Sequence, residues 1–118
     1  MQSLTDPRKV VLSYIDAMNN HDYKTARKYL NEDFSSVSPM GSCEEPEQFL
    51  KDAAGTNATY EVKKVFSDGE DVCILFDTAM PILTMFTCGW YHVEGGKINS
   101  IRLIFDASPF ANQNEREN

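Results

Sequence analysis

The sequence predicts a single α+β domain in which helices come first and an antiparallel sheet follows. The chain has 118 residues, which is enough for one hydrophobic core and too few for two. Apolar residues recur at helical spacing up to Gly55 and in strand-like alternation after it. Helices packed on one side of an antiparallel meander bury the apolar faces of both kinds of element. We therefore expect one domain over residues 1–110, followed by a polar tail over 111–118.

Two helices are expected at the start of the chain. The first has Thr5 or Asp6 as its N-cap and Pro7 in its first turn. Its apolar face consists of Val10, Val11, Tyr14, Ile15 and Met18. After a break at residues 19–21, Asp22 can cap a second, shorter helix. The apolar face of that helix consists of Tyr23, Ala26, Tyr29 and Leu30.

A third helix and then the sheet follow. Residues 31–42 are expected to be irregular or to hold a short strand, because Pro39 and Gly41 are breakers. Pro46 starts a helix that Gly55 ends. The alternation beyond it predicts three or four strands, over residues 59–66, 72–80, 82–93 and 97–106, with turns at 67–69 and 94–96 and with Pro81 marking an edge or crossing.

Charge and composition exclude several classes of partner. The formal net charge is −7, and the basic residues are scattered among the acidic ones, so no basic cluster is available for nucleic acid. No stretch approaches the roughly 20 apolar residues of a membrane span, and the first residues are too polar for a secretory leader. The three cysteines form no CxxC pair, which fits free thiols in a reducing compartment. We expect a cytoplasmic protein with neither a nucleic-acid nor a membrane partner.

The order of elements and three stretches of sequence resemble the nuclear transport factor 2-like (NTF2-like) superfamily, including its SnoaL-like polyketide-cyclase and ketosteroid-isomerase-like branches. The stretches are VVLSYIDAMNNHDYKTARKYLNEDF, SPMG and GWYHVEGGKINSIRLIFD, and the resemblance covers nearly the whole chain. It implies a cone-shaped, cystatin-like fold, in which a strongly curved, mostly antiparallel sheet wraps around the N-terminal helices and encloses a largely apolar pocket. It also implies that homodimers are common.

The ketosteroid-isomerase branch can be compared residue by residue. Its chemistry needs a carboxylate base and two hydroxyl-type donors in an apolar cavity. The resemblance puts Tyr14 at the tyrosine donor and Ser38 at the base. Counting back from Gly96 puts Cys88 at the second donor. Neither a serine nor a thiol reproduces a carboxylate that moves a proton between carbons, so no steroid isomerase activity is expected.

Four side chains are candidates for chemistry in such a pocket. Tyr14 can point its hydroxyl into a cavity from the first helix, or it can be an ordinary core tyrosine. Asp106 ends the stretch IRLIFD, where polyketide-cyclase-like members often carry a base, and Asp77 lies in ILFDTAM. Either carboxylate can instead face away from the cavity, because strand residues alternate between faces. His92 can act as an acid or a base near neutral pH, or it can be a structural strand residue.

The expected pocket lining is mostly apolar and comes from the first helix, the region after it and the late strands. It includes a possible strand wall of Phe86, Cys88, Trp90 and His92. The full set is Tyr14, Met18, Phe34, Ser38, Met40, Phe86, Cys88, Trp90, Ile101, Leu103 and Phe105. Metal-binding histidine spacings and the nucleotide-binding and serine-nucleophile motifs are absent from the sequence, so neither a metal nor a cofactor is expected.

Two functions remain open from the sequence. One is a pocket protein that binds a small apolar ligand without catalysis and pairs into a homodimer through an exposed sheet face. The other is a proton-transfer enzyme, an isomerase, cyclase or dehydratase, acting on a small apolar carbonyl compound. The dimer is expected because Ile82, Leu83 and the outer residues of 97–105 would otherwise leave apolar sheet surface in water.

Overall fold

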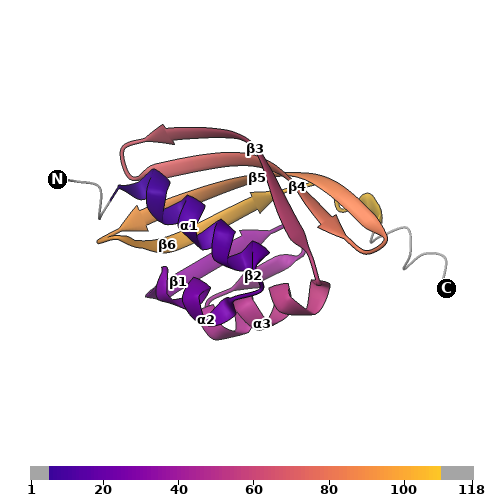
Figure 1. Ribbon diagram of the computed structural model, residues 1–118, viewed down its shortest axis with the longest axis horizontal. Coiled ribbons are helices and arrows are strands. Elements are labelled where there is room, and N and C mark those ends of the chain that lie inside the picture. The colour runs from indigo at the N-terminus through magenta and orange to yellow at the C-terminus, as the bar shows by residue number, and fades with distance from the viewer. Residues whose placement is uncertain (1–5, 110–118) are drawn as a thin grey trace.

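The computed structural model places three helices and six strands in residues 6–109, the part of the chain that it describes. The elements follow in the order α1 (Pro7–Asn19), α2 (Tyr23–Lys28), β1 (Leu30–Ser38), β2 (Gly41–Cys43), α3 (Pro46–Thr56), β3 (Thr59–Asp68), β4 (Asp71–Met80), β5 (Leu83–Glu94) and β6 (Lys97–Ile104). Figure 1 shows the helices gathered on one side of a long, bent sheet. The expected tail over residues 111–118 and the Thr5 N-cap lie outside the described residues.

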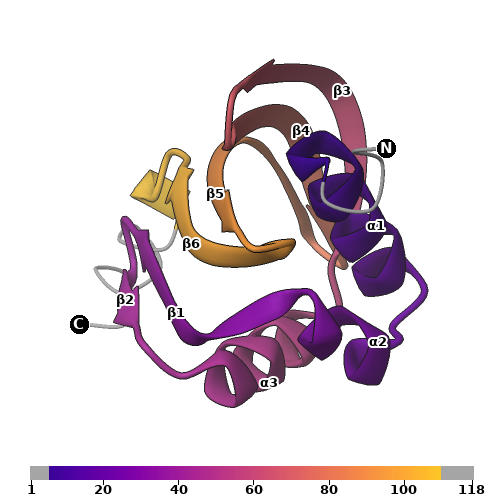
Figure 2. The ribbon, with the colours of Figure 1, turned by 90° about the vertical axis from the view of Figure 1, so that its left-hand side faces the viewer.

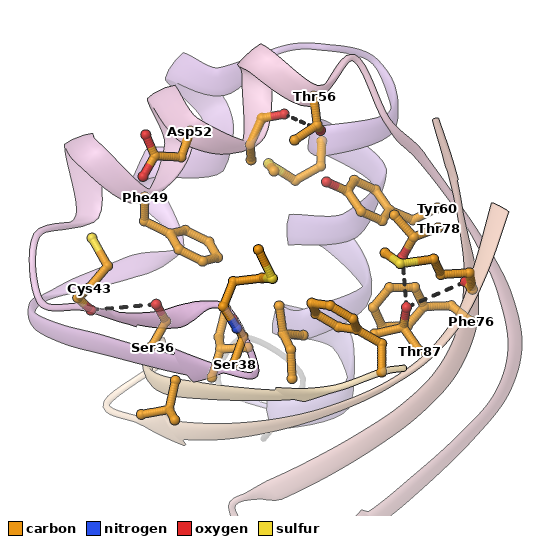
Figure 3. Close-up of a pocket in the computed structure, with 18 of the residues that line it drawn as sticks. Ser36, Ser38, Cys43, Phe49, Asp52, Thr56, Tyr60, Phe76, Thr78 and Thr87 are labelled. Carbon is orange, nitrogen blue, oxygen red and sulfur yellow. Dashed lines mark hydrogen bonds between the residues drawn. The ribbon is translucent and has the colours of Figure 1, made fainter. Parts of the chain in front are cut away.

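The six strands form one sheet in the order β2-β1-β6-β5-β4-β3. Strands β3 to β6 are an antiparallel meander, and β1 joins it through a parallel pairing with β6. The register shifts once between β3 and β4, once between β5 and β6 and once between β1 and β6. Such irregularities bend strands and increase their twist. Figure 2 shows the resulting curl, and the curved, mostly antiparallel sheet expected from the sequence is confirmed.

Helix α1 lies inside the curl and provides much of the core. Asp6 caps it by accepting a hydrogen bond from the backbone N–H of Arg8. The helix contacts β3, β4, β5 and β6 through the apolar face that the sequence predicts. Its C-terminal end is tied to β3, because the Asn19 side-chain amide both donates to the Tyr60 carbonyl (2.8 Å) and accepts from the Tyr60 N–H (2.7 Å).

Arg27 and one aromatic pair fix α3 against α2 and β1. The Arg27 guanidinium donates to the Leu30 carbonyl at 2.9 Å, to Glu32 at 3.1 Å and to Glu47 at 2.7 Å, which joins α2, β1 and α3. Under this bridge the rings of Phe34 and Phe49 contact each other with centroids 5.0 Å apart. These contacts set the position of α3 at one side of the interior.

The structure corrects three expectations about the elements. Leu30 was expected on the apolar face of the second helix, but it begins strand β1, which runs to Ser38 through the segment where an irregular stretch or a short strand was expected. The polar sequence of this strand weakens its alternation, and the pairing with β6 supplies its backbone partners. Gly55 lies inside α3 and does not end it. The helix runs to Thr56, and Asn57, which has a left-handed backbone (φ 54°), is its C-cap. Pro81 lies in the turn that joins β4 to β5, so it marks a hairpin and not a crossing.

Candidate functional site

The concave face of the sheet, α1 and α3 enclose a cavity of about 430 Å³. This volume lies within the roughly 300–1,000 Å³ that is typical of small-molecule sites. Most of its wall is carbon and sulfur from aliphatic, aromatic and methionine side chains. Those side chains include Ile15, Met18, Phe49, Phe76, Met80, Met85, Ile101, Leu103 and Phe105.

Three tyrosines form the polar part of the deep wall. Tyr14 comes from α1, Tyr60 from β3 and Tyr91 from β5, and the Tyr14 and Tyr91 rings have centroids 6.3 Å apart. Burial raises the pKa of Tyr60 to about 12, and it raises the pKa of Tyr14 and of Tyr91 well above the ordinary tyrosine value. All three phenols therefore remain neutral at physiological pH and keep the proton that a hydrogen-bond donor needs.

The three phenol hydroxyls open on the cavity. Within residues 6–109, none of them has a hydrogen-bond partner in the protein, and no fully enclosed side-chain nitrogen or oxygen atom lacks one. Each hydroxyl must therefore reach open space, and all three tyrosines line the cavity. A ligand with a hydrogen-bond acceptor would give these hydroxyls the partner that they lack.

Gly89 makes room for the Tyr91 ring. A Cβ atom at Gly89 would lie 2.7 Å from Cε1 and 2.9 Å from the hydroxyl of Tyr91, which is closer than real carbon contacts allow. The missing side chain thus lets the ring fold back along β5 on the concave face. The shape of this end of the cavity depends on the Tyr91 ring lying against Gly89.

A pair of threonines supplies the other polar feature of the wall. The hydroxyls of Thr78 on β4 and Thr87 on β5 are 2.9 Å apart, and Thr87 also donates to the Met85 carbonyl (3.4 Å). Thr87 is only 2% exposed. Its hydroxyl is satisfied by the protein itself, so it contributes shape more than ligand recognition.

The mouth of the cavity is more polar than its depth. Ser36 donates to the Cys43 carbonyl, and Ser38 accepts from the Met40 backbone N–H (3.0 Å). Asp52 of α3 lies at this rim, is exposed, and accepts from the Gln48 side chain at 2.8 Å. Among the described residues that line the cavity, Asp52 alone carries a formal charge at neutral pH. The interior is therefore neutral.

The structure separates Tyr14 from the other candidate catalytic residues. Tyr14 lines the cavity, as described above. Asp77 is on the convex face, where its carboxylate is 3.7 Å from the Lys63 ammonium. Asp106 follows the end of β6, is exposed, and accepts hydrogen bonds from the backbone and hydroxyl of Ser108. Neither Asp77 nor Asp106 lines the cavity.

His92 also lies outside the cavity. Its Nδ1 donates to Asp71 at 2.9 Å, and its Nε2 is 3.1 Å from a carboxylate oxygen of Glu94. Trp90 donates to the same Asp71 oxygen at 2.9 Å. The Asp71 hydrogen bond, followed by the one to Glu94, raises the pKa of His92. The group is a surface ion cluster and not part of the site.

The expected strand wall of β5 faces the wrong way. Phe86, Cys88 and Trp90 point to the convex face, because their alternation partners Thr87, Gly89 and Tyr91 point inward. Since Cys88 does not face the cavity, it cannot stand in for a donor there. Phe34 belongs to the core beside Phe49 and does not line the cavity either. The other expected lining residues do line it: Tyr14, Met18, Ser38, Met40, Ile101, Leu103 and Phe105.

Sequence reasoning missed several wall residues, chiefly Tyr60, Thr78, Met80, Met85, Thr87 and Tyr91. The pair Gly89 and Tyr91 is the sequence signal that could have identified the inward face of this strand, because a glycine inside a strand often marks a close approach of another group. If Tyr91 is taken to point inward, strand alternation makes Phe86, Cys88 and Trp90 point outward.

Residues 6–109 contain no group of three or more His, Cys, Asp or Glu side chains arranged to hold a metal ion. None of the helices in this part of the chain has the length and apolar character to cross a membrane.

Helices packed in a curved, unclosed six-stranded sheet around an apolar cavity define an α+β protein of the NTF2-like class. The model of the SnoaL-like domain matches residues 11–101, and the chain belongs to that family. The superfamily expected from the sequence is thereby confirmed. A search of the curated proteins finds no match to this chain.

Solved structures agree on the fold. An NTF2-like protein of unknown function from Cytophaga hutchinsonii is 37% identical, with a TM-score of 0.86 and coverage of 90% of this chain and 95% of that one. A candidate ketosteroid isomerase from Kribbella flavida is 13% identical (TM-score 0.78, coverage 85% and 77%). A candidate SnoaL-like polyketide cyclase from Shewanella denitrificans is 14% identical (TM-score 0.75, coverage 93% and 97%). At such low identity the last two show the shared fold alone.

Proposed function

We propose that this chain binds a small, neutral, largely apolar molecule that carries a hydrogen-bond acceptor, and that it has no steroid isomerase activity. The observation that carries this proposal is the combination of a neutral cavity interior with three phenol hydroxyls, from Tyr14, Tyr60 and Tyr91, that have no partner within the described residues. An acceptor such as a carbonyl or ether oxygen can take a hydrogen bond from a neutral phenol. A carboxylate or ammonium ligand would lose its hydration and gain no opposite charge in the interior.

The same geometry supports binding over proton transfer. A proton-transfer enzyme needs a base within hydrogen-bond reach of its substrate. The predicted bases Asp77, Asp106 and His92 lie outside the cavity, and Asp52 is an exposed rim residue already bonded to Gln48. An isomerase, cyclase or dehydratase activity would thus have a donor in Tyr14 and no base inside. We expect no conversion of a β,γ-unsaturated ketosteroid; measurable turnover that Tyr14→Phe abolishes would favour the enzyme.

A pair of dyes tests the binding proposal directly. N-phenyl-naphthylamine is uncharged and brightens in apolar surroundings, whereas anilinonaphthalene sulfonate is similar in shape and anionic. We expect the neutral dye to bind more tightly at neutral pH. Leu103→Trp fills the cavity and should abolish binding, while the matched Ile104→Trp, one residue along β6 on the convex face, should leave it unchanged. Equal binding by both variants would refute the proposal.

Tyr14→Phe measures the polar part of recognition. Loss of one neutral hydrogen bond costs about 0.5–1.5 kcal/mol, which corresponds to a roughly 2- to 13-fold weaker affinity. The effect should be seen by calorimetric titration with an acceptor-bearing ligand found in a thermal-shift screen of steroid, polyketide-like and short acyl compounds. An apolar hydrocarbon of similar size should bind the two proteins equally, because it offers Tyr14 no acceptor.

The convex face supports a homodimer as a second part of the proposal. Phe66, Phe86, Trp90 and Ile104 are each at least half exposed and lie on the convex face, on β3, β5 and β6 of the meander β6-β5-β4-β3. A second copy would remove this apolar surface from water. Sedimentation at micromolar concentration should give a dimer, and Phe86→Asp should convert it to a folded monomer. A wild-type monomer would contradict this part alone. The cytoplasmic location expected from the sequence stays a prediction.

A further inference from the structure

Two cysteines lie side by side on the convex face, away from the cavity. Cys73 of β4 pairs with Trp90, and Cys88 of β5 pairs with Leu75, so the two cysteines are diagonal neighbours on adjacent strands. Their Sγ atoms are 3.4 Å apart. We propose that Cys73 and Cys88 are a redox-sensitive dithiol that a peroxide oxidises to a reversible intramolecular disulfide. This proposal does not depend on what the cavity binds.

The two sulfur atoms are already close to bonding distance. A disulfide bond is about 2.05 Å long, so the two Sγ atoms would have to approach by roughly 1.4 Å from their present 3.4 Å. The Cα–Cβ bond of each cysteine can rotate to contribute to that approach. Strands β4 and β5 are paired without a register shift from Asp71↔His92 to Met80↔Leu83, which keeps the two thiols beside each other.

Access and the third cysteine also favour a bond between these two. Cys73 and Cys88 are each partly exposed in the single protomer, so a molecule as small as hydrogen peroxide can reach them there. A second copy on the convex face would cover both thiols, because Phe66 and Trp90 flank Cys73 in the ladder, so the oxidation is measured on protein diluted to the monomer or in a Phe86→Asp background. Cys43 lies on β2 at the far edge of the sheet order, and its thiol donates to the Glu45 carbonyl at 3.5 Å. Within the described residues, Cys73 and Cys88 therefore have only each other as a thiol partner.

The chemistry balances with one peroxide. The Cys73 thiolate attacks a peroxide oxygen; an S–O bond forms, the O–O bond breaks, and the leaving hydroxide takes a proton to become water. The Cys88 sulfur then attacks the Cys73 sulfenic acid, loses its proton, forms the S–S bond and releases a second water. Burial, and after it the neighbouring Cys73 thiol, raises the pKa of Cys88 to about 11, so Cys88 suits the second step better than the first. An external dithiol reverses the reaction by thiol–disulfide exchange.

The test is a thiol count on the full chain. Reduced protein is treated with hydrogen peroxide, quenched in acid and then alkylated with N-ethylmaleimide under denaturing conditions. The number of adducts should fall from three to one, and the mass of the protein itself should fall by two hydrogens. The matched Cys43→Ser control should fall from two adducts to none. Cys73→Ser and Cys88→Ser should form no intramolecular bridge. Retention of all three adducts, oxidation to sulfinic acid without a bridge, or a bridge to Cys43 would each overturn the proposal.

Trp90 gives a second, non-destructive readout. It is the sole tryptophan of the chain, and it sits directly opposite Cys73 in the ladder. Because a disulfide quenches a neighbouring indole, its fluorescence should fall on oxidation and recover with dithiothreitol in the wild type and in Cys43→Ser. The same treatment of Cys88→Ser should produce no reversible change; an equal reversible change there would contradict the proposal.

Discussion

The two faces of strands β4 and β5 differ sharply, although their residues alternate along the same backbone. The concave face carries hydroxyls, methionines and aromatic rings and, within the described residues, no charged group on these strands. The convex face carries the Asp71–His92–Glu94 cluster, the Asp77–Lys63 pair and the two neighbouring thiols. One strand pair thus separates a neutral interior from a chemically varied surface.

Residue type alone therefore does not locate a site in a sheet. On β4 and β5 the acid–base and thiol groups lie on the convex face, where water or ion partners stabilise them, while the concave face of these strands carries groups that stay neutral. The features that looked most chemical in the sequence, Asp77, His92 and Cys88, are all on the outside. The phenols give the interior its polarity.

The largest predicted effect comes from moving a charge between the faces at neighbouring positions. Thr87→Asp puts a carboxylate at a 2% exposed site and should lower the free energy of unfolding by about 3–5 kcal/mol, the usual cost of an uncompensated buried charge. Phe86→Asp puts the same group at a 60% exposed site, where the cost to a folded protomer should stay below about 1 kcal/mol. Urea denaturation measures both.

Thr87→Val is the matched control for this pair. It keeps the shape of the side chain, removes the hydrogen bond to Thr78 and should cost about 1 kcal/mol. If Thr87→Asp were no worse than Thr87→Val, the interior at this position would be wet, and the contrast between the two faces would fail.

Gly89→Ala should give the next largest effect. The new methyl would meet the Tyr91 ring, so the ring must move or the strand must shift, at a cost of roughly 1–3 kcal/mol. The variant should also weaken binding of the neutral dye, because it reshapes the deep wall. Gly55→Ala in α3 is the control: a Cβ there meets nothing within 4 Å, so stability should be unchanged or rise slightly. Equal stability of the two variants would refute the packing argument.

The smallest predicted effect is a pH dependence of the convex face. Because the pKa of His92 is raised in the folded chain, its contribution to stability is full below the unfolded value of about 6.5 and is lost as the pH rises through the folded pKa. Asp71→Asn removes the main cause and should move the folded pKa back down. Titration of the His92 ring proton by NMR, assigned with His21→Gln, checks the shift; an unchanged pKa in Asp71→Asn would contradict it.

The fold could be predicted from the sequence because its patterns agree with each other. Capping at Asp6 and Asp22, the helical spacing of the first apolar residues and the alternation after Asn57 all favour the same architecture. Only a short strand or an irregular segment was predicted for β1, because Ser35, Ser36 and their polar neighbours obscure its alternation, and its partner β6 lies more than sixty residues away in the chain. Non-local pairing of this kind leaves little trace in a local pattern.

The site was only half predictable, for a physical reason. Ile101 and Leu103 of β6, and Phe105 just after it, were placed correctly because they alternate with the charged Arg102, which marks the outer face. On β5 both faces carry aromatic residues, so hydrophobicity does not distinguish Trp90 from Tyr91. The curl of the sheet and the glycine beneath the Tyr91 ring decide which one faces inward.

An NMR titration of the wild-type chain with the neutral dye, with the methionine methyl groups labelled, shows directly whether the cavity binds a small apolar molecule. Met18, Met80 and Met85 line the cavity, and the Trp90 indole reports on the convex face. We predict saturable shifts of the three methyl signals at dye concentrations that leave the Trp90 indole proton unmoved. Shifts of the Trp90 indole with unmoved methyl signals would contradict the account, because the dye would then be binding on the outside of the sheet.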